Sequence, residues 1–328
     1  MSLSSDQNIK TLIKPARLSP GQTVGIVSPA SPSNDLESTR IALEIVESLG
    51  FHAKPALHLS EYYGYLAGDD ATRAADLNGM FVDPDVDAIF CLRGGYGASR
   101  LLPMLDYDLI RANPKILLGY SDITSLLLSI YTKSGVVGYH GPIASQTFTT
   151  YTLAEFKKVL CAPQPRMTIG APPPFEGGEG RVERKNRITT LVPGQSQGRL
   201  LGGNLSLVAH LIGTPYMPDL SGAILFLEDV GEAVYSIDRM LTQLWLSGNL
   251  QKAAGIVFGK FSELKPSERL HNRLLEEVLA ERARALNIPT VMGLMIGHID
   301  DQTTVPVGCL AELDASAGTL TLLEEPVS

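Results

Sequence analysis

The amino-acid sequence predicts two α/β domains, the first of which contains a parallel β-sheet. Short apolar runs alternate with segments of helical periodicity, and this alternation is typical of strands joined by helices. The apolar runs are continuous rather than alternating, which indicates strands that are buried on both faces of a sheet. The chain has 328 residues, and at about 100–200 residues per domain this length corresponds to two domains.

The first half of the chain contains three predicted strands and two predicted helices. The runs Thr23–Val27 (TVGIV), Asp87–Leu92 (DAIFCL) and Lys115–Gly119 (KILLG) are short, continuous and apolar, as buried strands are. Leu36–Leu49 has apolar residues at helical spacing and ends before a glycine, and Ile123–Tyr131 is a second helical run. Strand, loop and helix thus alternate as in a parallel sheet covered on both faces.

The composition changes between residues 161 and 198, where the chain contains APQP, APPP, EGGEG and the charged stretch RVERKNR. Such Pro- and Gly-rich sequence predicts an irregular connector. Helical and strand patterns resume after it: helices Leu205–Ile212, Ile237–Leu246 and Arg273–Leu286, and strands Ala223–Leu227, Ala254–Phe258 and Val291–Gly297. We therefore predict an N-terminal domain at residues 1–160, a connector at 161–198 and a C-terminal domain at 199–328.

The bulk composition argues against several classes of function. The formal net charge of −8 speaks against a nucleic-acid partner, because contact with phosphates needs clustered Lys and Arg. No run of about 18 consecutive apolar residues occurs, so we expect no membrane span. The first residues contain no apolar run of the roughly 7–15 residues that a signal peptide needs, and we expect a cytoplasmic protein.

The three cysteines, Cys91, Cys161 and Cys309, are widely spaced and odd in number. Their spacing predicts no disulfide framework and, without nearby histidines, no zinc site. Cys91 lies in an apolar run and is expected to be a small core residue. The sequence predicts neither a metal nor a cofactor. It leaves the oligomeric state open, with a homodimer among the alternatives.

The most informative segment joins the strand Lys115–Gly119, through Tyr120, Ser121 and Asp122, directly to a helix. A nucleophile elbow has this layout: a sharp turn lifts the serine Oγ and points the first helical N–H groups at an oxyanion. The segment departs from the signature G-x-S-x-G, because no glycine follows Asp122 before the helix. The alternative is that Ser121 merely caps the helix, with Asp122 favoured by the helix dipole.

A nucleophilic serine needs a general base, and two of the six histidines are good candidates. His140 in VVGYHGP and His298 in VMGLMIGHIDDQ each end an apolar run. Both positions suit an active site, because ligands gather at the carboxyl ends of strands in α/β sheets. Position alone does not choose between them. Three of the other histidines, His52, His58 and His271, lie in polar contexts. His210 lies on an apolar helical face and is expected in the core.

The base must be held in the right tautomer by a carboxylate. Glu228 follows the apolar run AILFL and is well placed at a strand end, whereas its neighbours Asp229 and Glu232 are competing candidates. The alternative is that all three acids cap the following turn.

The loop Arg93–Gly97 (RGGYG) follows another predicted strand. Two adjacent glycines, Gly94 and Gly95, let backbone N–H groups approach a ligand closely because no Cβ is in the way. The loop is therefore a candidate anion cradle or half of an oxyanion hole, with a plain turn as the alternative. It matches neither G-x-G-x-x-G nor a P-loop. Arg93 and Arg239 are candidate partners for a substrate carboxylate on chemical grounds alone.

Taken in order along the chain, these segments resemble the LD-carboxypeptidase family, which includes the microcin-C self-immunity peptidases. The resemblance covers nearly the whole chain and is far more specific than any single motif. It is carried by these blocks: PARLSPGQTVGIVSPAS at 15–31, FCLRGGYGASRLLPMLDY at 90–107, LLGYSDITSLL at 117–127, YHGP at 139–142, LLGGNLSLVAHLIGTPY at 200–216, ILFLEDVGEAVYSIDRML at 224–241 and MGLMIGHIDDQTTVPVG at 292–308.

The resemblance implies a Ser–Glu–His catalytic triad. Carried over by motif, Ser121 is the nucleophile, Glu228 the carboxylate and His298 the base, which gives His140 a neighbouring or structural role. The implied oxyanion hole uses the backbone N–H of Asp122 and one from the double-glycine loop, Gly95 or Gly94. The implied fold is a flavodoxin-like N-terminal domain with a smaller α/β C-terminal domain that supplies Glu and His.

The family's usual substrate is a cytoplasmic murein tetrapeptide, from which terminal D-alanine is released during cell-wall recycling. The microcin-immunity branch instead cleaves an aminoacyl-nucleotide conjugate, and its site should stack the base on an aromatic residue of a loop. The connector has only Phe175 and no Trp or Tyr, which favours the murein peptide. A non-catalytic peptide-binding protein on the same scaffold is a third alternative, although it would not need all three triad residues.

Overall fold

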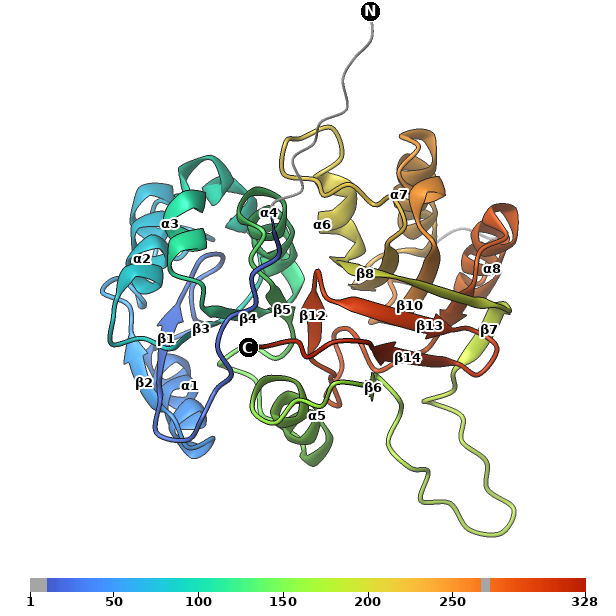
Figure 1. Cartoon of the computed structure of the whole chain (residues 1–328), viewed down its shortest axis with the longest axis horizontal. Helices are drawn as coiled ribbons and strands as arrows, with labels where there is room; N and C mark the ends of the chain where they lie inside the picture. Colours follow the sequence, from blue (N-terminus) through green and yellow to red (C-terminus); the bar gives the residue numbers. More distant parts are fainter. Residues whose placement is uncertain (1–10, 267–271) are drawn as a thin grey trace, which may run out of the picture.

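The structure, a computed structural model, describes residues 11–266 and 272–328 and contains two β-sheets with helices packed against them (Figure 1). The helices are α1 Leu36–Ser48, α2 Asp70–Val82, α3 Tyr107–Ala112, α4 Thr124–Ser134, α5 Thr150–Leu160, α6 Leu205–His210, α7 Val234–Leu246 and α8 Leu275–Leu286, with short 3₁₀ helices at η1 Ala98–Met104, η2 Ser121–Ile123 and η3 Leu250–Lys252. The strands are β1 Thr23–Val27, β2 His52–Pro55, β3 Ala88–Cys91, β4 Ile116–Gly119, β5 Gly138–His140, β6 Met167–Ile169, β7 Thr189–Val192, β8 Gln195–Asn204, β9 Ile224–Val230, β10 Gly255–Ser262, β11 Thr290–Met292, β12 Val305–Val307, β13 Leu310–Asp314 and β14 Thr319–Leu322.

The first sheet has the strand order β12-β5-β4-β3-β1-β2. Its first five strands along the chain pair in parallel. All of them except the edge strand β2 are buried, as expected for a parallel sheet covered by helices on both faces. Helices α2, α3 and α4 lie on one side of this sheet and α1 and α5 on the other (Figure 1). The prediction of an α/β fold with a parallel sheet in the first half of the chain is confirmed.

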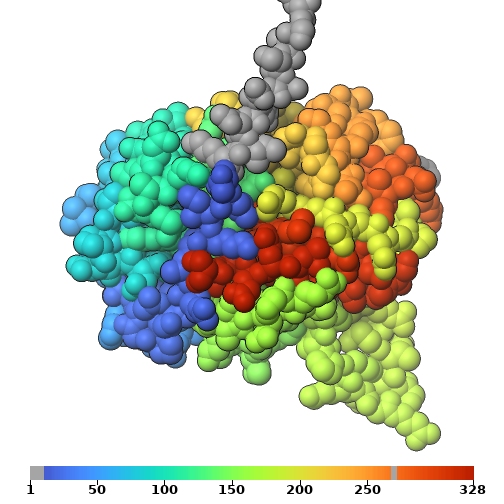
Figure 2. Space-filling view, in the orientation of Figure 1, coloured from blue at the N-terminus to red at the C-terminus, as the bar shows by residue number. Residues whose placement is uncertain are grey.

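The second sheet has the order β6-β14-β13-β8-β9-β10-β11-β7. Its centre, β8 to β11, is parallel, and antiparallel strands continue it on both edges. The predicted connector contributes β6 and β7 to the two opposite edges and also the start of β8. Between β6 and β7 the chain projects from the body of the molecule (Figure 2).

The predicted strand Val291–Gly297 is too long, because β11 ends at Met292. Gly293 and Gly297 have φ angles of 103° and 130°, and this left-handed backbone cannot continue a strand. Residues 293–304 form a loop instead, after which β12 pairs antiparallel with β5 of the first sheet. The chain therefore crosses from one sheet to the other through the segment that contains His298. None of the helices in the described residues is both long and apolar enough to cross a bilayer.

Candidate active site

Ser121 stands at the turn between β4 and α4 in a strained backbone conformation. Its φ angle is 64°, and only two other described non-glycine residues have a positive φ. A β-carbon disfavours this left-handed region, so a side chain is held there only when the surroundings fix it. The sharp turn places Ser121 at the start of the short helix η2, where its side chain is partly exposed in a pocket. This is the geometry expected of a nucleophile elbow.

Glu228 and His298 are joined by a direct hydrogen bond. Glu228 lies on β9 and is fully buried, and its Oε2 is 2.7 Å from Nδ1 of His298. The close approach depends on Gly297, because a Cβ there would lie 3.0 Å from the Cβ of Glu228. A carboxylate on Nδ1 fixes the proton on that nitrogen and leaves Nε2 free to accept one.

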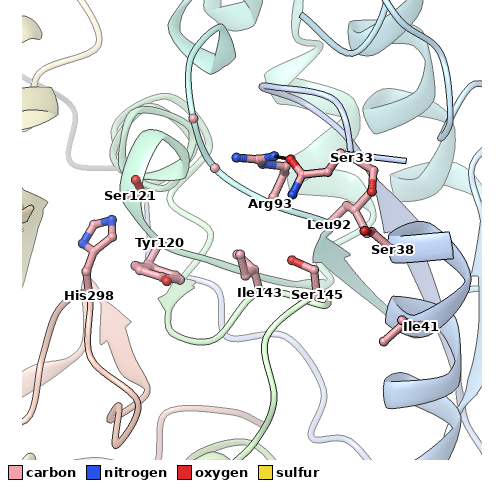
Figure 3. Close-up of a pocket in the computed structure, with 13 residues that line it drawn as sticks. Ser33, Ser38, Ile41, Leu92, Arg93, Tyr120, Ser121, Ile143, Ser145 and His298 are labelled. Atoms are coloured by element: carbon pink, nitrogen blue, oxygen red, sulfur yellow. Dashed lines mark hydrogen bonds between the residues drawn. The ribbon is translucent and has the colours of Figure 1, made fainter. Parts of the chain in front are cut away.

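Ser121 and His298 line the same cavity, which has a volume of about 500 Å³. Its walls come from both halves of the chain. The turn after β4, the loops after β3 and β5, and the start of α1 with the residues before it provide one part, and His298 provides the other. Figure 3 shows the side chains of Ser121 and His298 on neighbouring elements, with the ring of Tyr120 beside them. A substrate in this cavity would contact both residues.

The double-glycine loop lies directly against Ser121. A Cβ on Gly94 would be 2.9 Å from the Cβ of Ser121 and 3.2 Å from its Oγ, so only glycine allows this approach. Ser31 holds the loop, since its N–H donates to Gly94 O at 3.3 Å and its Oγ accepts from Tyr96 N–H at 3.1 Å.

Three N–H groups beside Ser121 are free to bind an anion. Among the described residues, the backbone N–H groups of Gly94, Gly95 and Asp122 form no hydrogen bond. Gly94 and Gly95 line the same cavity as Ser121, and Asp122 follows it directly. The oxyanion hole, formed by Asp122 and either Gly95 or Gly94, stays a prediction.

Asp122 has a role that the sequence did not predict. Its buried carboxylate accepts a hydrogen bond of 2.7 Å from the N–H of Ala98, which follows the glycine loop. Burial raises the pKa of Asp122 to about 6, against the opposing effect of the hydrogen bond from Ala98 and the charge of Arg73. The side chain therefore fastens the elbow to the loop. Its place beside Ser121 in the motif was the available signal.

His140 is the last residue of β5, and it is His298 rather than His140 that is hydrogen-bonded to Glu228. It is completely buried at the end of β5, and neither ring nitrogen has a partner among the described residues. Burial, with the nearby His298, lowers the pKa of His140 to about 3, so its imidazole is neutral. Its ring centroid lies 5.4 Å from that of Phe226 and 6.0 Å from that of Tyr120.

Tyr120 links His140 to His298. Its ring meets that of His298 edge to face, with 4.7 Å between the centroids. Burial, together with the nearby charge of Glu228, raises the pKa of Tyr120 to about 12. The phenol is therefore neutral at ordinary pH and offers the imidazole an aromatic wall. The sequence analysis did not single out this residue, although it occupies the position before the serine.

Of the other candidate residues, Arg93 lines the cavity and Asp229, Glu232 and Arg239 do not. Asp229 accepts hydrogen bonds from Asn204 Nδ2 at 3.0 Å and from Ser206 Oγ at 2.8 Å. Arg239 is exposed and lies over the ring of Tyr235, with 5.8 Å to the centroid, whereas Arg93 lines the cavity. Glu232 is partly exposed and does not line the cavity.

One expectation about the remaining histidines was wrong. His210 is exposed rather than buried, because it is the last residue of α6 and the buried face of that helix is formed by Leu205, Val208 and Ala209. His58 is hydrogen-bonded to Asp76, with 2.8 Å between Nδ1 and Oδ1, and this bond raises its pKa. His52 is exposed on β2, and His271 lies outside the described residues.

Known proteins resemble this chain over nearly all of its length. Residues 24–141 match the LD-carboxypeptidase N-terminal domain and residues 197–313 the LD-carboxypeptidase C-terminal domain. A probable murein peptide carboxypeptidase of Bacillus subtilis is 38% identical over 93% of each chain. A murein tetrapeptide carboxypeptidase of Pseudomonas aeruginosa is 33% identical over 89% of this chain and 93% of its own.

The same resemblance extends to solved structures. The structure of MccF in complex with glutamyl sulfamoyl guanosine superposes with a TM-score of 0.85 at 28% identity, over 96% of this chain and all of the other. Fold and matches together make the protein an α/β peptidase with carboxypeptidase relatives. It belongs to the LD-carboxypeptidase family, so the family expected from the sequence motifs is confirmed.

Proposed function

We propose that the protein is a serine-type LD-carboxypeptidase that releases the terminal D-alanine of a murein tetrapeptide in cell-wall recycling. The observation that carries the proposal is the hydrogen bond of 2.7 Å between Glu228 and His298, at the edge of the cavity that Ser121 also lines. A buried carboxylate, an imidazole and a serine in a strained turn are the three parts of a hydrolytic triad. The cytoplasmic location stays a prediction from the sequence.

In the proposed first half-reaction, Ser121 Oγ attacks the scissile carbonyl while Nε2 of His298 takes its proton. Glu228 stabilises the imidazolium that forms, because its carboxylate accepts the Nδ1–H. The N–H of Asp122 and that of Gly95 or Gly94 hold the oxyanion; losing one such donor typically costs about 10²–10³ in rate. His298 then protonates the leaving amine.

In the second half-reaction, water attacks the acyl-enzyme. His298 removes a proton from the water, and the same backbone donors hold the second oxyanion. His298 finally returns a proton to Ser121 Oγ, which releases the shortened peptide and restores the enzyme. Every proton transfer in both half-reactions passes through His298.

The test is incubation of the purified protein with murein tetrapeptide, with the products identified by mass. We expect loss of one alanine residue by the wild type, and no turnover above background by Ser121→Ala or His298→Ala. His140→Ala should retain more activity than either. Activity of His298→Ala equal to wild type, with loss of activity in folded His140→Ala, would reverse the assignment of the base.

A second candidate function is hydrolysis of an aminoacyl-nucleotide conjugate, which the similarity to MccF favours. The aromatic side chain in the projecting segment between β6 and β7 is Phe175, which is 47% exposed. A single phenyl ring offers a weaker stacking surface for a purine than an indole does, and the murein peptide is therefore the preferred substrate. The same assay with an aminoacyl sulfamoyl adenosine compares the two directly.

A third alternative, a peptide-binding protein without catalysis, predicts binding of the tetrapeptide by wild-type protein without any product. Calorimetry of the same mixture distinguishes it from the peptidase.

A further inference from the structure

The Arg, Lys, Asp and Glu side chains that line the active-site cavity differ in sign from the net charge of the whole protein. The chain carries a formal charge of −8, yet the cavity wall contains no Asp or Glu side chain among the described residues. Arg93 is the one Lys or Arg side chain in that wall. An isolated arginine in a cavity without acids attracts an anionic group of the ligand.

Hydrogen bonds to neutral acceptors hold Arg93 in place. Its Nη1 donates to Asn34 Oδ1 at 2.8 Å and to the backbone oxygen of Pro32 at 3.2 Å. Within the described residues it forms no ion pair with an acidic side chain and no other hydrogen bond. A guanidinium has five N–H donors, so several stay available on a side chain whose direction is already fixed.

Other arginines near this end of the first sheet are paired internally. Arg73 and Arg100 both bind the carboxylate of Asp70, the latter through contacts of 2.7–3.0 Å. Each of them therefore has an acidic partner within the protein, although the two share one carboxylate. Arg93 differs because the fold orients it but supplies no counter-charge.

Arg93 is also close to the reacting atoms. It directly precedes Gly94, which lies against the Oγ of Ser121. In Figure 3 its side chain lies between Ser121 and the segment that contains Ser33 and Ser38. A group bound to Arg93 would therefore belong to the same substrate whose carbonyl faces Ser121.

We propose that Arg93 is the residue that binds a carboxylate of the substrate and so selects peptides with a negative charge near the scissile bond. This inference rests on the proposed carboxypeptidase function. Two carboxylates have suitable chemistry: the C-terminal one of the leaving residue and a side-chain one on the acyl side. Either matches the planar guanidinium fork, which forms paired hydrogen bonds that lysine cannot reproduce.

The test measures kcat/KM for three peptides: the free tetrapeptide, its C-terminal amide and the analogue amidated at the side-chain carboxylate next to the scissile bond. Arg93→Gln should lower kcat/KM on the free peptide by about 10- to 100-fold, as expected for a lost hydrogen bond to a charged group. Arg93→Lys should recover only part of the loss. The matched control Arg239→Gln removes the same charge from the exposed surface of α7 and should leave kcat/KM unchanged.

The amidated peptides identify the carboxylate. The wild type should lose about the same factor on the amide whose carboxylate Arg93 binds, and Arg93→Gln should lose nothing further on that peptide. On the other amide the full effect of Arg93→Gln should persist. Thermal melting of each variant shows that it is folded, and Arg93→Lys provides the same comparison if Arg93→Gln does not fold.

Two failures are distinguishable. If the wild type cleaves the tetrapeptide but Arg93→Gln matches it, or loses equally on all three peptides, this inference is overturned and the proposed function stands. If folded wild-type protein cleaves none of the peptides, the proposed function is overturned and the inference falls with it.

Discussion

The carboxylate of Asp122 accepts a hydrogen bond of 2.7 Å from the backbone N–H of Ala98 and thereby joins the nucleophile elbow to the glycine loop. These two segments carry the backbone donors proposed for the oxyanion. Asp122 is only 3% exposed, and burial raises its pKa to about 6. The carboxylate that holds the two segments together therefore changes its charge near pH 6.

The first prediction concerns the stability of Asp122→Asn at different pH values. The folded-state pKa of Asp122 is about 6, above the ordinary aspartate value of 3.8, so between these values the folded protein binds more protons than the unfolded chain. Stability contributed by this group therefore increases as the pH falls from about 6 towards 4 and is absent at neutral pH. The asparagine variant lacks this contribution.

Urea unfolding of both proteins at pH 7 and pH 4.5 measures this effect. The free energy of unfolding of the wild type should rise relative to Asp122→Asn by on the order of 2 kcal/mol between the two conditions. Other titrating groups are common to both proteins and cancel. A difference that does not change with pH would show that Asp122 titrates normally.

The second prediction concerns His140. Its folded-state pKa of about 3 lies below the ordinary histidine value of 6.5, so between these values the unfolded chain binds a proton at this residue and the folded protein does not. This group costs stability as the pH falls from about 6.5 towards 3, opposite in sign to Asp122. His140→Phe keeps an aromatic ring between Phe226 and Tyr120 and removes the two unpartnered nitrogens.

We therefore expect His140→Phe to gain stability over the wild type as the pH falls below 6.5, while kcat at neutral pH drops by no more than about tenfold. His140→Ala leaves a cavity between Phe226 and Tyr120 and should lose about 2–4 kcal/mol at pH 7, and less at pH 5, because it also removes the titrating ring. Thermal or urea unfolding at pH 7 and pH 5 measures both effects. A loss of kcat in folded His140→Phe as large as in Ser121→Ala would assign a direct catalytic role to the ring.

The sequence predicted the local parts of the fold well and the long-range pairings poorly. Three strands and two helices of the first half follow from their hydrophobic pattern, and β1 was predicted with its observed bounds. Strands β2 and β5 and helices α2, α3 and α5 were not predicted. No local pattern shows that β12, near the C-terminus, pairs with β5 of the first sheet. The short edge strands β6 and β7 were also missed, because they have only three and four residues and lie in a segment whose Pro- and Gly-rich stretches predicted an irregular connector.

In the candidate site, too, the local motif could be predicted from the sequence and the long-range contacts could not. The elbow at Ser121 is a local motif, so the sequence located it. His140 and His298 each end an apolar run, and only tertiary structure shows that the first is buried in the sheet and the second lies in a loop between the sheets. Neighbouring residues of a strand point to opposite faces. For this reason Glu228 contacts His298 whereas Asp229 contacts Ser206.

The third prediction concerns Glu228→Gln. The amide keeps the size of the carboxylate but not its charge, so the imidazolium that forms in the proposed reaction loses its stabilising partner. The amide NH₂ also favours the wrong tautomer of His298. We expect kcat to fall by about 10⁴-fold with a KM within a few-fold of wild type. Steady-state kinetics on the tetrapeptide measures this. A variant that retains more than a tenth of wild-type kcat would show that Glu228 only supports the fold.

The last prediction uses the strained backbone at Ser121, whose φ angle is 64°. Alanine and glycine both remove the hydroxyl, so both variants should lose kcat by several orders of magnitude. They should differ in stability, because glycine adopts this left-handed conformation without the steric cost that a Cβ imposes. In urea unfolding, the free energy of unfolding of Ser121→Gly should exceed that of Ser121→Ala by about 1 kcal/mol.

The matched control is Ser48, an exposed residue at the end of α1. Its backbone has no positive φ, so Ser48→Ala should be more stable than Ser48→Gly by about 0.5–1 kcal/mol, the reverse of the order at Ser121. The same order at both sites would show that no strain is stored at the elbow. Reversal of the order together with loss of activity at Ser121 alone would tie the strained conformation to the residue that attacks the substrate, since the fold then maintains an unfavourable backbone where the chemistry needs an exposed hydroxyl.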